Sequence, residues 1–145
     1  MKFLCGKLAK SLAADGEGAT KFIEILVMGA KDVFDAKTVA RKISTSNLLK
    51  CAVCGEDPNW GRAVAAAGAA EVNFDPDRVD VYLGNVKALS NGQSVKALDK
   101  EKAKKAFKEK DVYIKVDLKS GRSSAKSWTC DFSKEYVAIN SEYST

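Results

Sequence analysis

Hydrophobic positions in the first third of the chain follow a helical and an extended period in turn. Apolar residues within 3–14 recur at helical spacing, and Gly16 follows where a left-handed helix stop is expected, so a helix is predicted there. Residues 21–28 form a run of large and β-branched side chains that ends at Gly29, which predicts a largely buried strand. Within 35–46, apolar residues recur at i, i+3, i+4 and i+7, and this spacing predicts an amphipathic helix.

Two shorter segments follow this helix. Residues 48–54 are a brief apolar run between polar and turn-forming residues, and the run predicts another buried strand. Asn59 is a typical helix cap, and the small side chains that follow it to about Gly68 predict a helix that packs closely on its neighbours. A buried strand and then a tightly buried helix are therefore expected.

Strands dominate the second half of the chain, around one lysine-rich helix. Alternating polar and apolar residues predict the strands, and Asp99 is placed to cap the helix. In chain order we predict a turn at 75–77, a hairpin-like β segment over 79–89, a turn at 90–92, a helix from 99 to 110, strands over 112–118 and 125–132, and a short polar tail from 134. This order predicts an α/β fold, a mixed β-sheet with packed helices, in a single domain over 1–145.

Composition narrows the class of protein. The chain has 145 residues, 46% of them hydrophobic, which is enough for a core that needs no metal or disulfide. Lys and Arg number 24 against 19 Asp and Glu, and this modest net charge of +5 argues only weakly for nucleic acid. No apolar run reaches the roughly 18 residues of a membrane-spanning helix, and the charged start lacks a signal-peptide core. We expect a soluble, cytoplasmic protein with reduced cysteines.

Cys51 and Cys54 have the spacing of half a zinc site, but the chain has no second such pair and no histidine. On the predicted strand, residues three apart point to opposite faces, so structural core cysteines are favoured over a metal or redox pair. The absence of histidine also excludes Ser-His and Cys-His catalysis. Any chemistry must then use carboxylates, amines, hydroxyls or thiols.

Three polar motifs allow both a structural and a functional interpretation. Residues 16–21, Gly-Glu-Gly-Ala-Thr-Lys, lead from helix into strand, the reverse of a phosphate-binding loop; from the residues alone, a structural turn is favoured over ligand binding by Glu17. Residues 57–62, Asp-Pro-Asn-Trp-Gly-Arg, are best explained as an anchored helix start with Trp60 as packing mass. The lysine-rich residues 100–110 contain acids and no arginine, which favours a solvated helix face over an RNA-binding helix.

Four segments taken together resemble one enzyme family. They are Leu-Ala-Ala-Asp-Gly-Glu-Gly-Ala-Thr-Lys at 12–21, Asp-Pro-Asn-Trp-Gly-Arg at 57–62, Trp-Thr-Cys-Asp at 128–131 and Tyr-Val-Ala-Ile-Asn-Ser-Glu-Tyr-Ser-Thr at 136–145. In this order they resemble the ornithine acetyltransferase, or glutamate N-acetyltransferase, family of arginine biosynthesis, in the C-terminal part of its β chain. The resemblance runs from about Leu8 to Thr145 and covers only the last part of the family's full-length precursor.

The resemblance implies acetyl transfer without a metal or cofactor. Members of this family cleave their precursor before a threonine, and the resulting α and β chains pair into a heterotetramer. The threonine takes acetyl from N-acetylornithine, with acetyl-CoA as an additional donor in some members, and then passes it to glutamate. Such covalent catalysis splits one difficult acyl transfer into two easier ones, and a terminal amine can act as the base in place of histidine.

Three substrate-binding positions carry over from the family: Glu17, Asn140 and Thr145. Glu17 is suited to pair with an ammonium group of ornithine, while the Asn140 amide and the Thr145 hydroxyl are suited to hydrogen-bond its polar ends. With the family in view, a binding role for Glu17 is favoured over a turn. For residues 57–62 and Trp128 the resemblance implies no direct role.

The chain departs from the family because it lacks the nucleophile. The family's Ala followed by Thr-Met-Leu does not occur, residues 19–21 are not its equivalent, and the oxyanion-hole threonine and glycine belong to the α chain. We therefore expect a fragment, a separately encoded subunit or a decayed copy. Its expected partners are the α chain and the missing N-terminal part of the β chain in a hetero-oligomer, with neither nucleic acid nor a membrane. The alternatives are an orphan, non-catalytic amino-acid-binding domain and, resting on the lysine-rich helix, an RNA-binding domain.

Overall fold

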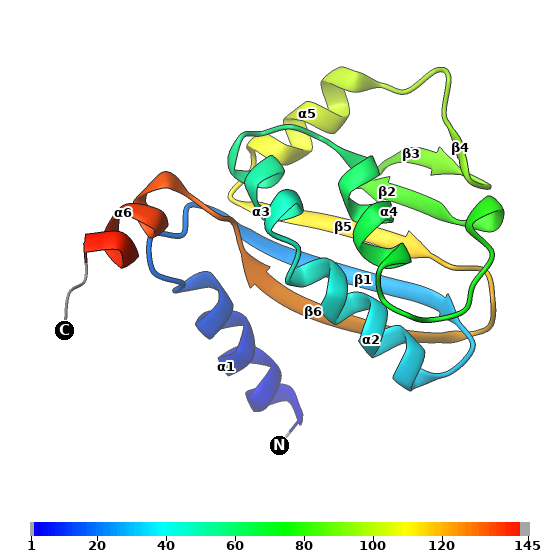
Figure 1. Ribbon diagram of the computed structural model, residues 1–145, viewed down its shortest axis with the longest axis horizontal. Helices are drawn as coiled ribbons and strands as arrows, with labels where there is room; N and C mark the ends of the chain where they lie inside the picture. Colours follow the sequence, from blue (N-terminus) through cyan, green and yellow to red (C-terminus); the bar gives the residue numbers. More distant parts are fainter. Residues whose placement is uncertain (1, 143–145) are drawn as a thin grey trace.

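Residues 2–142, which the computed structural model describes, build a six-stranded mixed sheet with helices packed on it (Figure 1). The helices are α1 (Lys2–Ala14), α2 (Val33–Ser44), α3 (Asn47–Cys54), α4 (Trp60–Gly68), the short 3-10 helix η1 (Pro76–Arg78), α5 (Lys100–Lys108) and α6 (Lys134–Glu142). The strands are β1 (Phe22–Ala30), β2 (Asp80–Leu83), β3 (Val86–Ser90), β4 (Gln93–Ser94), β5 (Asp111–Asp117) and β6 (Ser123–Cys130). The predicted α/β class with a mixed sheet is confirmed.

The strand order of the sheet is β4-β3-β2-β5-β1-β6. β1 runs parallel to β5 and antiparallel to β6, and β2 is antiparallel to β5. β5 and β6 follow each other in the sequence but do not pair, because β1 lies between them. Phe22 at the start of β1 pairs with Cys130 at the end of β6, so the loop before β1 and the segment after β6 meet at one end of the sheet.

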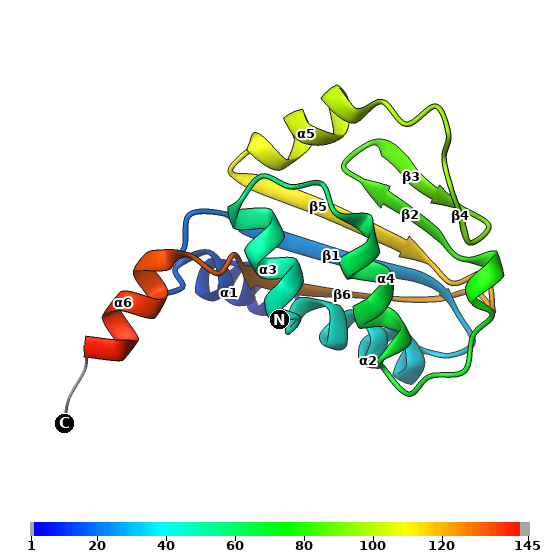
Figure 2. The same ribbon diagram turned by 45° about the horizontal axis from the view of Figure 1, so that its top comes forward.

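The core lies between the sheet and the layer formed by α2, α3 and α4. Ile23, Ile25 and Val27 alternate along β1 and are fully buried, as are Val39 and Ile43 of α2. Figures 1 and 2 show α2, α3 and α4 together on this side of the sheet. The amphipathic pattern of α2 and the small-residue pattern of α4 are confirmed, since each helix buries the face that its sequence predicts.

The opposite face of the sheet carries α1 and a buried carboxylate. Glu24 of β1 points to this face, because the residues on either side of it point into the core. Lys126 and Lys10 pair with its oxygens at 2.6 and 3.0 Å, and Trp128 Nε1 donates to it at 2.8 Å. Burial raises the pKa of Glu24, but the hydrogen bonds from these three side chains outweigh burial and lower it to about 2. The pair with Lys10 ties α1 to the sheet.

Helix α1 presents an apolar stripe to the outside. The helix predicted over 3–14 is confirmed. Leu4, Leu8 and Leu12 recur at i, i+4 and i+8 on one side of it, and they are 62%, 57% and 77% exposed. A contiguous apolar stripe of this kind is typical of a surface that contacts another polypeptide.

Residues 48–54 form helix α3, so the predicted strand is wrong. Ser46 caps the helix by accepting a hydrogen bond from Leu49 N at 3.3 Å. Leu49, Ala52 and Val53 are buried, and their spacing of i, i+3 and i+4 is helical. A short apolar run fits either period, and the cap together with this spacing decides for the helix.

Near both ends of the chain, the structure differs from what the sequence pattern predicts. The tail, which the sequence shows only as short and polar, contains helix α6, and the Ser133 hydroxyl accepts from Tyr136 N at 3.1 Å in its first turn. Gly16 does not adopt the left-handed conformation predicted for it, whereas Gly18 does, with a φ of 64°. The loop after α1 therefore turns two residues later than predicted.

Helix α5 has the solvated face that its composition predicts. Asp99 caps it by accepting from Lys102 N at 3.0 Å, Ala103 and Phe107 are buried, and the lysines of the helix are exposed. The predicted cap and solvated face are confirmed. No helix within the described residues is both long enough and apolar enough to cross a membrane.

Candidate functional site

The loop between α1 and β1 carries Glu17, and this loop lies against helix α6. Asn140 Nδ2 donates to Glu17 Oε2 at 2.9 Å, and the same nitrogen lies 2.9 Å from the carbonyl oxygen of Tyr136. Both the Glu17 and the Asn140 side chains are exposed. The fold therefore joins two of the three residues that the sequence points to, across 123 positions of the chain. The third, Thr145, lies outside the described residues.

Close packing of this loop on α6 requires a glycine beside Glu17. Gly18 is in the left-handed region, and a Cβ atom there would lie 2.6 Å from Tyr136 N. Ser133 Oγ donates to the carbonyl oxygen of Gly18 at 2.5 Å. Any larger residue would push the loop away from α6 and would strain its own backbone. The second glycine of the Gly-Glu-Gly motif thus permits the contact between Glu17 and Asn140.

Asp131 holds the downstream end of the same loop. Its Oδ1 accepts from Thr20 N at 2.8 Å and from Lys21 N at 2.9 Å, and its Oδ2 accepts from Thr20 Oγ1 at 2.5 Å. The residue is 3% exposed. Burial raises the pKa of Asp131, but the hydrogen bonds from Thr20 and Lys21 outweigh burial, so the pKa lies below its ordinary value. The carboxylate is therefore charged, and its oxygens are engaged with the loop.

The lysine of this loop is engaged in the fold and not with Glu17. Lys21 Nζ donates to the carbonyl oxygens of Phe107 and Glu109 at 2.8 and 3.3 Å and pairs with Glu56 at 3.4 Å. Its side chain is 9% exposed. Lys21, the lysine of the motif, therefore does not pair with the Glu17 carboxylate, and this carboxylate is accessible to a cationic ligand.

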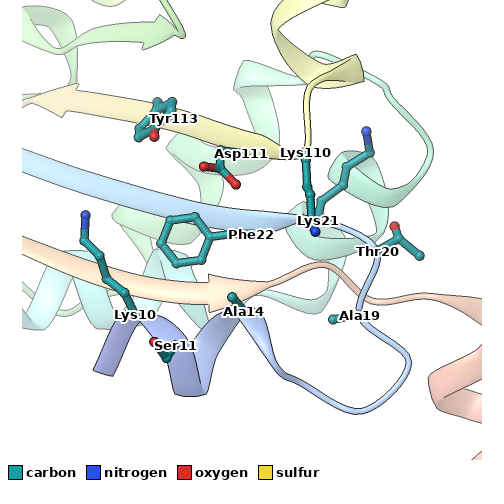
Figure 3. A pocket seen from close by; sticks show the side chains of 10 residues that line it. All are labelled: Lys10, Ser11, Ala14, Ala19, Thr20, Lys21, Phe22, Lys110, Asp111 and Tyr113. Carbon is teal, nitrogen blue, oxygen red and sulfur yellow. The ribbon is translucent and has the colours of Figure 1, made fainter. Parts of the chain in front are cut away.

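A cavity of about 340 Å³ lies next to the loop, between α1 and the first residues of β1 and β5 (Figure 3). Lys10 and Phe22 line it together with Tyr113, and the cavity shares Thr20 with the loop. Glu17 and Asn140 are not among the described residues that line it. We take the Glu17–Asn140 pair as the candidate site, because it joins two of the side chains that the family resemblance points to for ligand binding.

Residues 57–62 have the structural role that their pattern predicts. Asn59 Oδ1 accepts from Arg62 N at 3.3 Å and so caps α4, and Asn59 Nδ2 donates to Asp57 at 3.1 Å. Arg62 Nη1 donates to the carbonyl oxygen of Leu48 at 2.6 Å, which ties α4 to α3. Trp60 packs against the core while only partly buried. The segment anchors a helix start, as expected.

The prediction that Cys51 and Cys54 are core cysteines on a strand needs correction. Both lie on helix α3, Cys51 is exposed and Cys54 is half-buried. Residues three apart on a helix share a face, so the argument from strand geometry does not apply. Burial raises the pKa of the Cys54 thiol, and the neighbouring carboxylate of Asp131 raises it further. Within residues 2–142, no group of three or more His, Cys, Asp or Glu is arranged to hold a metal ion.

The whole chain, residues 1–145, matches the model of the ArgJ family. The chain belongs to the ArgJ family. It is 48% identical to the arginine biosynthesis bifunctional protein ArgJ of Caldanaerobacter subterraneus, and the match covers 100% of this chain and 37% of that protein. The corresponding protein of Thermotoga neapolitana is 47% identical, with 95% of this chain and 36% of that protein covered. The chain thus spans little more than a third of the length of these curated relatives.

A solved ArgJ structure shares this fold. The crystal structure of arginine biosynthesis bifunctional protein ArgJ from Bacillus halodurans matches with a TM-score of 0.94 at 39% sequence identity, covering 97% of this chain and 66% of that chain. The resemblance inferred from four short motifs is therefore confirmed over the full length of this chain. Curated ArgJ proteins are named as arginine biosynthesis proteins.

Sequence reasoning missed two residues of the site, Asp131 and Ser133. Asp131 is the last residue of the Trp-Thr-Cys-Asp segment, which contributed to the resemblance but received no role. Ser133 precedes α6, a helix that the polar tail did not reveal. The available signal was a Ser three residues before Tyr136, at a strand-to-helix junction, which is a common N-cap position.

Proposed function

We propose that this chain is the substrate-binding part of an acetyltransferase that moves acetyl from N-acetylornithine to glutamate in arginine biosynthesis. In this reaction the acetyl carbon forms an ester with a threonine hydroxyl as its amide bond to ornithine breaks, and the released amine takes the proton. The amine of glutamate then attacks the ester, N-acetylglutamate leaves, and the hydroxyl is restored. Membership of the ArgJ family supports this assignment. Acetyl-CoA is a possible second donor, and the cycle needs no metal or cofactor.

The contact between Glu17 and Asn140 is the observation that carries the proposal. Asn140 Nδ2 faces one carboxylate oxygen of Glu17 at 2.9 Å, which leaves the other carboxylate oxygen and the amide oxygen for donors on a ligand. Two acceptors side by side, one of them charged, suit the ammonium group of an amino acid such as ornithine. We assign Thr145, which follows Asn140 by five residues, as the third group of this site.

The nucleophile is assigned to a part of the family protein outside this chain. We propose that this chain works with the α chain and the N-terminal part of the β chain, in a cytoplasmic heterotetramer. The share of the Caldanaerobacter relative that this chain covers, 37%, leaves ample polypeptide for those parts. The exposed leucine stripe of α1 supports a contact with them, because association would bury apolar surface that is otherwise in water.

A substitution in the stripe tests this contact. Leu12 and Phe34 are 77% and 76% exposed, but Leu12 lies in the stripe and Phe34 lies on α2. Leu12→Lys should weaken binding to the unmatched part of the Caldanaerobacter relative by at least roughly tenfold, since burying a leucine contributes about 1.5–3 kcal/mol. Phe34→Lys is the matched control and should leave the dissociation constant, measured by calorimetry, unchanged. Equal binding of the Leu12→Lys variant and the wild type would contradict the assigned surface.

A charge-removing substitution tests the catalytic proposal. In the assembled enzyme, Glu17→Gln should raise KM for N-acetylornithine by roughly tenfold to a hundredfold, because a hydrogen bond to a charged group contributes about 1.5–3 kcal/mol. Asp15→Asn removes an exposed carboxylate two residues away and should leave KM unchanged.

Three results would each require another interpretation. An unaltered KM in Glu17→Gln would remove the role given to this residue. Binding of ornithine to the chain, measured by calorimetry, without acetyl transfer in any assembly would favour an orphan amino-acid-binding domain. Neither binding nor transfer would favour a decayed copy.

A further inference from the structure

The segment between β6 and α6 contacts the Glu17 loop at two points, on either side of the turn. Asp131 accepts from the backbone N–H groups of Thr20 and Lys21 and from the Thr20 hydroxyl. Ser133 donates to the carbonyl oxygen of Gly18, the residue that follows Glu17. These contacts form one hydrogen-bonded unit between the end of a strand and the start of a helix, which consists of Gly18, Thr20, Lys21, Asp131 and Ser133.

We propose that Asp131 and Ser133 are positioning residues that set the geometry between Glu17 and Asn140 without touching the substrate. This inference rests on the proposed function, because it assigns the substrate ammonium to Glu17. Ser133 connects both members of the pair: its hydroxyl donates to the Gly18 carbonyl and accepts from Tyr136 N, in the first turn of the helix that carries Asn140. Asp131 fixes the exit of the loop into β1.

Burial, together with the hydrogen bonds that these two residues already make within the protein, keeps them from direct substrate contact. Asp131 and Ser133 are 3% and 6% exposed. Both oxygens of Asp131 accept from the loop, and the Ser133 hydroxyl uses its donor on Gly18 while accepting from Tyr136. Their effect on a ligand must therefore pass through the loop and α6. A shift of about 1 Å in a binding group can cost a large part of its interaction, so the supporting contacts matter as much as the groups themselves.

The chain supplies a matched control for each residue. Asp80 is also 3% exposed and also accepts three hydrogen bonds, from Lys87, Lys119 and Asn91 N, but it lies in β2, away from the loop. Ser44 is 6% exposed, like Ser133, and accepts a hydrogen bond of 2.8 Å from Ser127 Oγ between α2 and β6. Asp80→Asn and Ser44→Ala therefore remove equally buried polar contacts without changing the loop.

Steady-state kinetics of the assembled enzyme test the proposal. Asp131→Asn and Ser133→Ala should each raise KM for N-acetylornithine on the order of tenfold, with kcat changed much less, because the loss falls on substrate binding. Ser133→Thr keeps the hydroxyl and should restore KM. Asp80→Asn and Ser44→Ala should leave KM at the wild-type value even where they lower the melting temperature.

Amide hydrogen exchange of the chain gives a second readout that needs no activity. The N–H groups of Thr20 and Lys21 should exchange faster in Asp131→Asn, while Asp80→Asn leaves their rates unchanged. If Asp131→Asn does not fold, Ser133→Ala and its threonine rescue decide the matter alone. An unchanged KM in Ser133→Ala, or an equal rise in the Ser44→Ala control, would overturn the proposal provided that Glu17→Gln raises KM. If Glu17→Gln leaves KM unchanged, the proposed function fails instead. In that case, an amide exchange rate of Thr20 in Asp131→Asn that is as slow as in the wild type would also overturn the positioning role.

Discussion

Replacing Glu24 with glutamine should lower the free energy of unfolding, and by more at neutral than at acidic pH. The side chain of Glu24 is 8% exposed and accepts from Lys126 at 2.6 Å, from Lys10 at 3.0 Å and from Trp128 at 2.8 Å. Glutamine keeps the shape of the side chain and one acceptor oxygen but removes the charge that two ammonium groups face. Helix α1 then loses the ion pair that ties it to β1.

The structure gives the size of this effect. The pKa of Glu24 is lowered from 4.5 to about 2. At about 1.36 kcal/mol for each pKa unit, this difference corresponds to about 3.4 kcal/mol. Lys10 and Lys126 are 47% and 48% exposed, so solvent screens both pairs, and we expect a loss of about 2 kcal/mol near neutral pH. Because the folded pKa is the lower one, the stabilisation is complete above about pH 5 and is lost as the pH falls toward about 2.

Urea unfolding followed by circular dichroism near neutral pH and at about pH 3 measures this loss. The difference between Glu24→Gln and the wild type should fall from about 2 kcal/mol to about 1 kcal/mol or less between the two conditions. Glu101→Gln on α5 is the control, because Glu101 is exposed and its replacement should change little at either pH. A loss of the same size at both pH values would refute the reasoning, since it would show that shape and not charge stabilises this contact.

Three further substitutions test local features of the fold. Gly18→Ala should lower the free energy of unfolding by about 1–3 kcal/mol, because the left-handed backbone and the approach of Tyr136 N leave no room for a Cβ. Gly6→Ala in α1 should instead raise it by about 0.5–1 kcal/mol, because nothing lies within 4 Å of the added Cβ. Thermal melting of the two variants measures both changes, and equal melting temperatures would contradict the packing of the loop on α6. Ser46→Ala should cost about 1 kcal/mol in urea unfolding because it removes the cap of α3, while a retained free energy of unfolding would mean that the cap contributes nothing.

The elements that were predictable from sequence are those whose pattern is long or explicitly capped. In residues 35–46 apolar side chains recur on one helical face over about three turns, and α2 forms there with this face buried. Asn59 and Asp99 cap the helices that follow them, because a side-chain acceptor at that position satisfies a backbone N–H that no helical turn can reach. The strand prediction for residues 48–54 was wrong because seven residues are too few to separate a helical from an extended period.

The sequence by itself determined the α/β class, the long elements and the family, because side-chain period, caps and short motifs act within a few residues of the chain. Only the tertiary structure decided that β1 lies between β5 and β6, and this order brings the Glu17 loop against Asp131, Ser133 and the helix that carries Asn140. No local pattern reveals the contacts that Asp131 and Ser133 make with the Glu17 loop; the N-cap spacing of Ser133 indicates only its contact with Tyr136 N. Those contacts reach groups more than a hundred residues away along the chain, and no local periodicity encodes a contact at that distance.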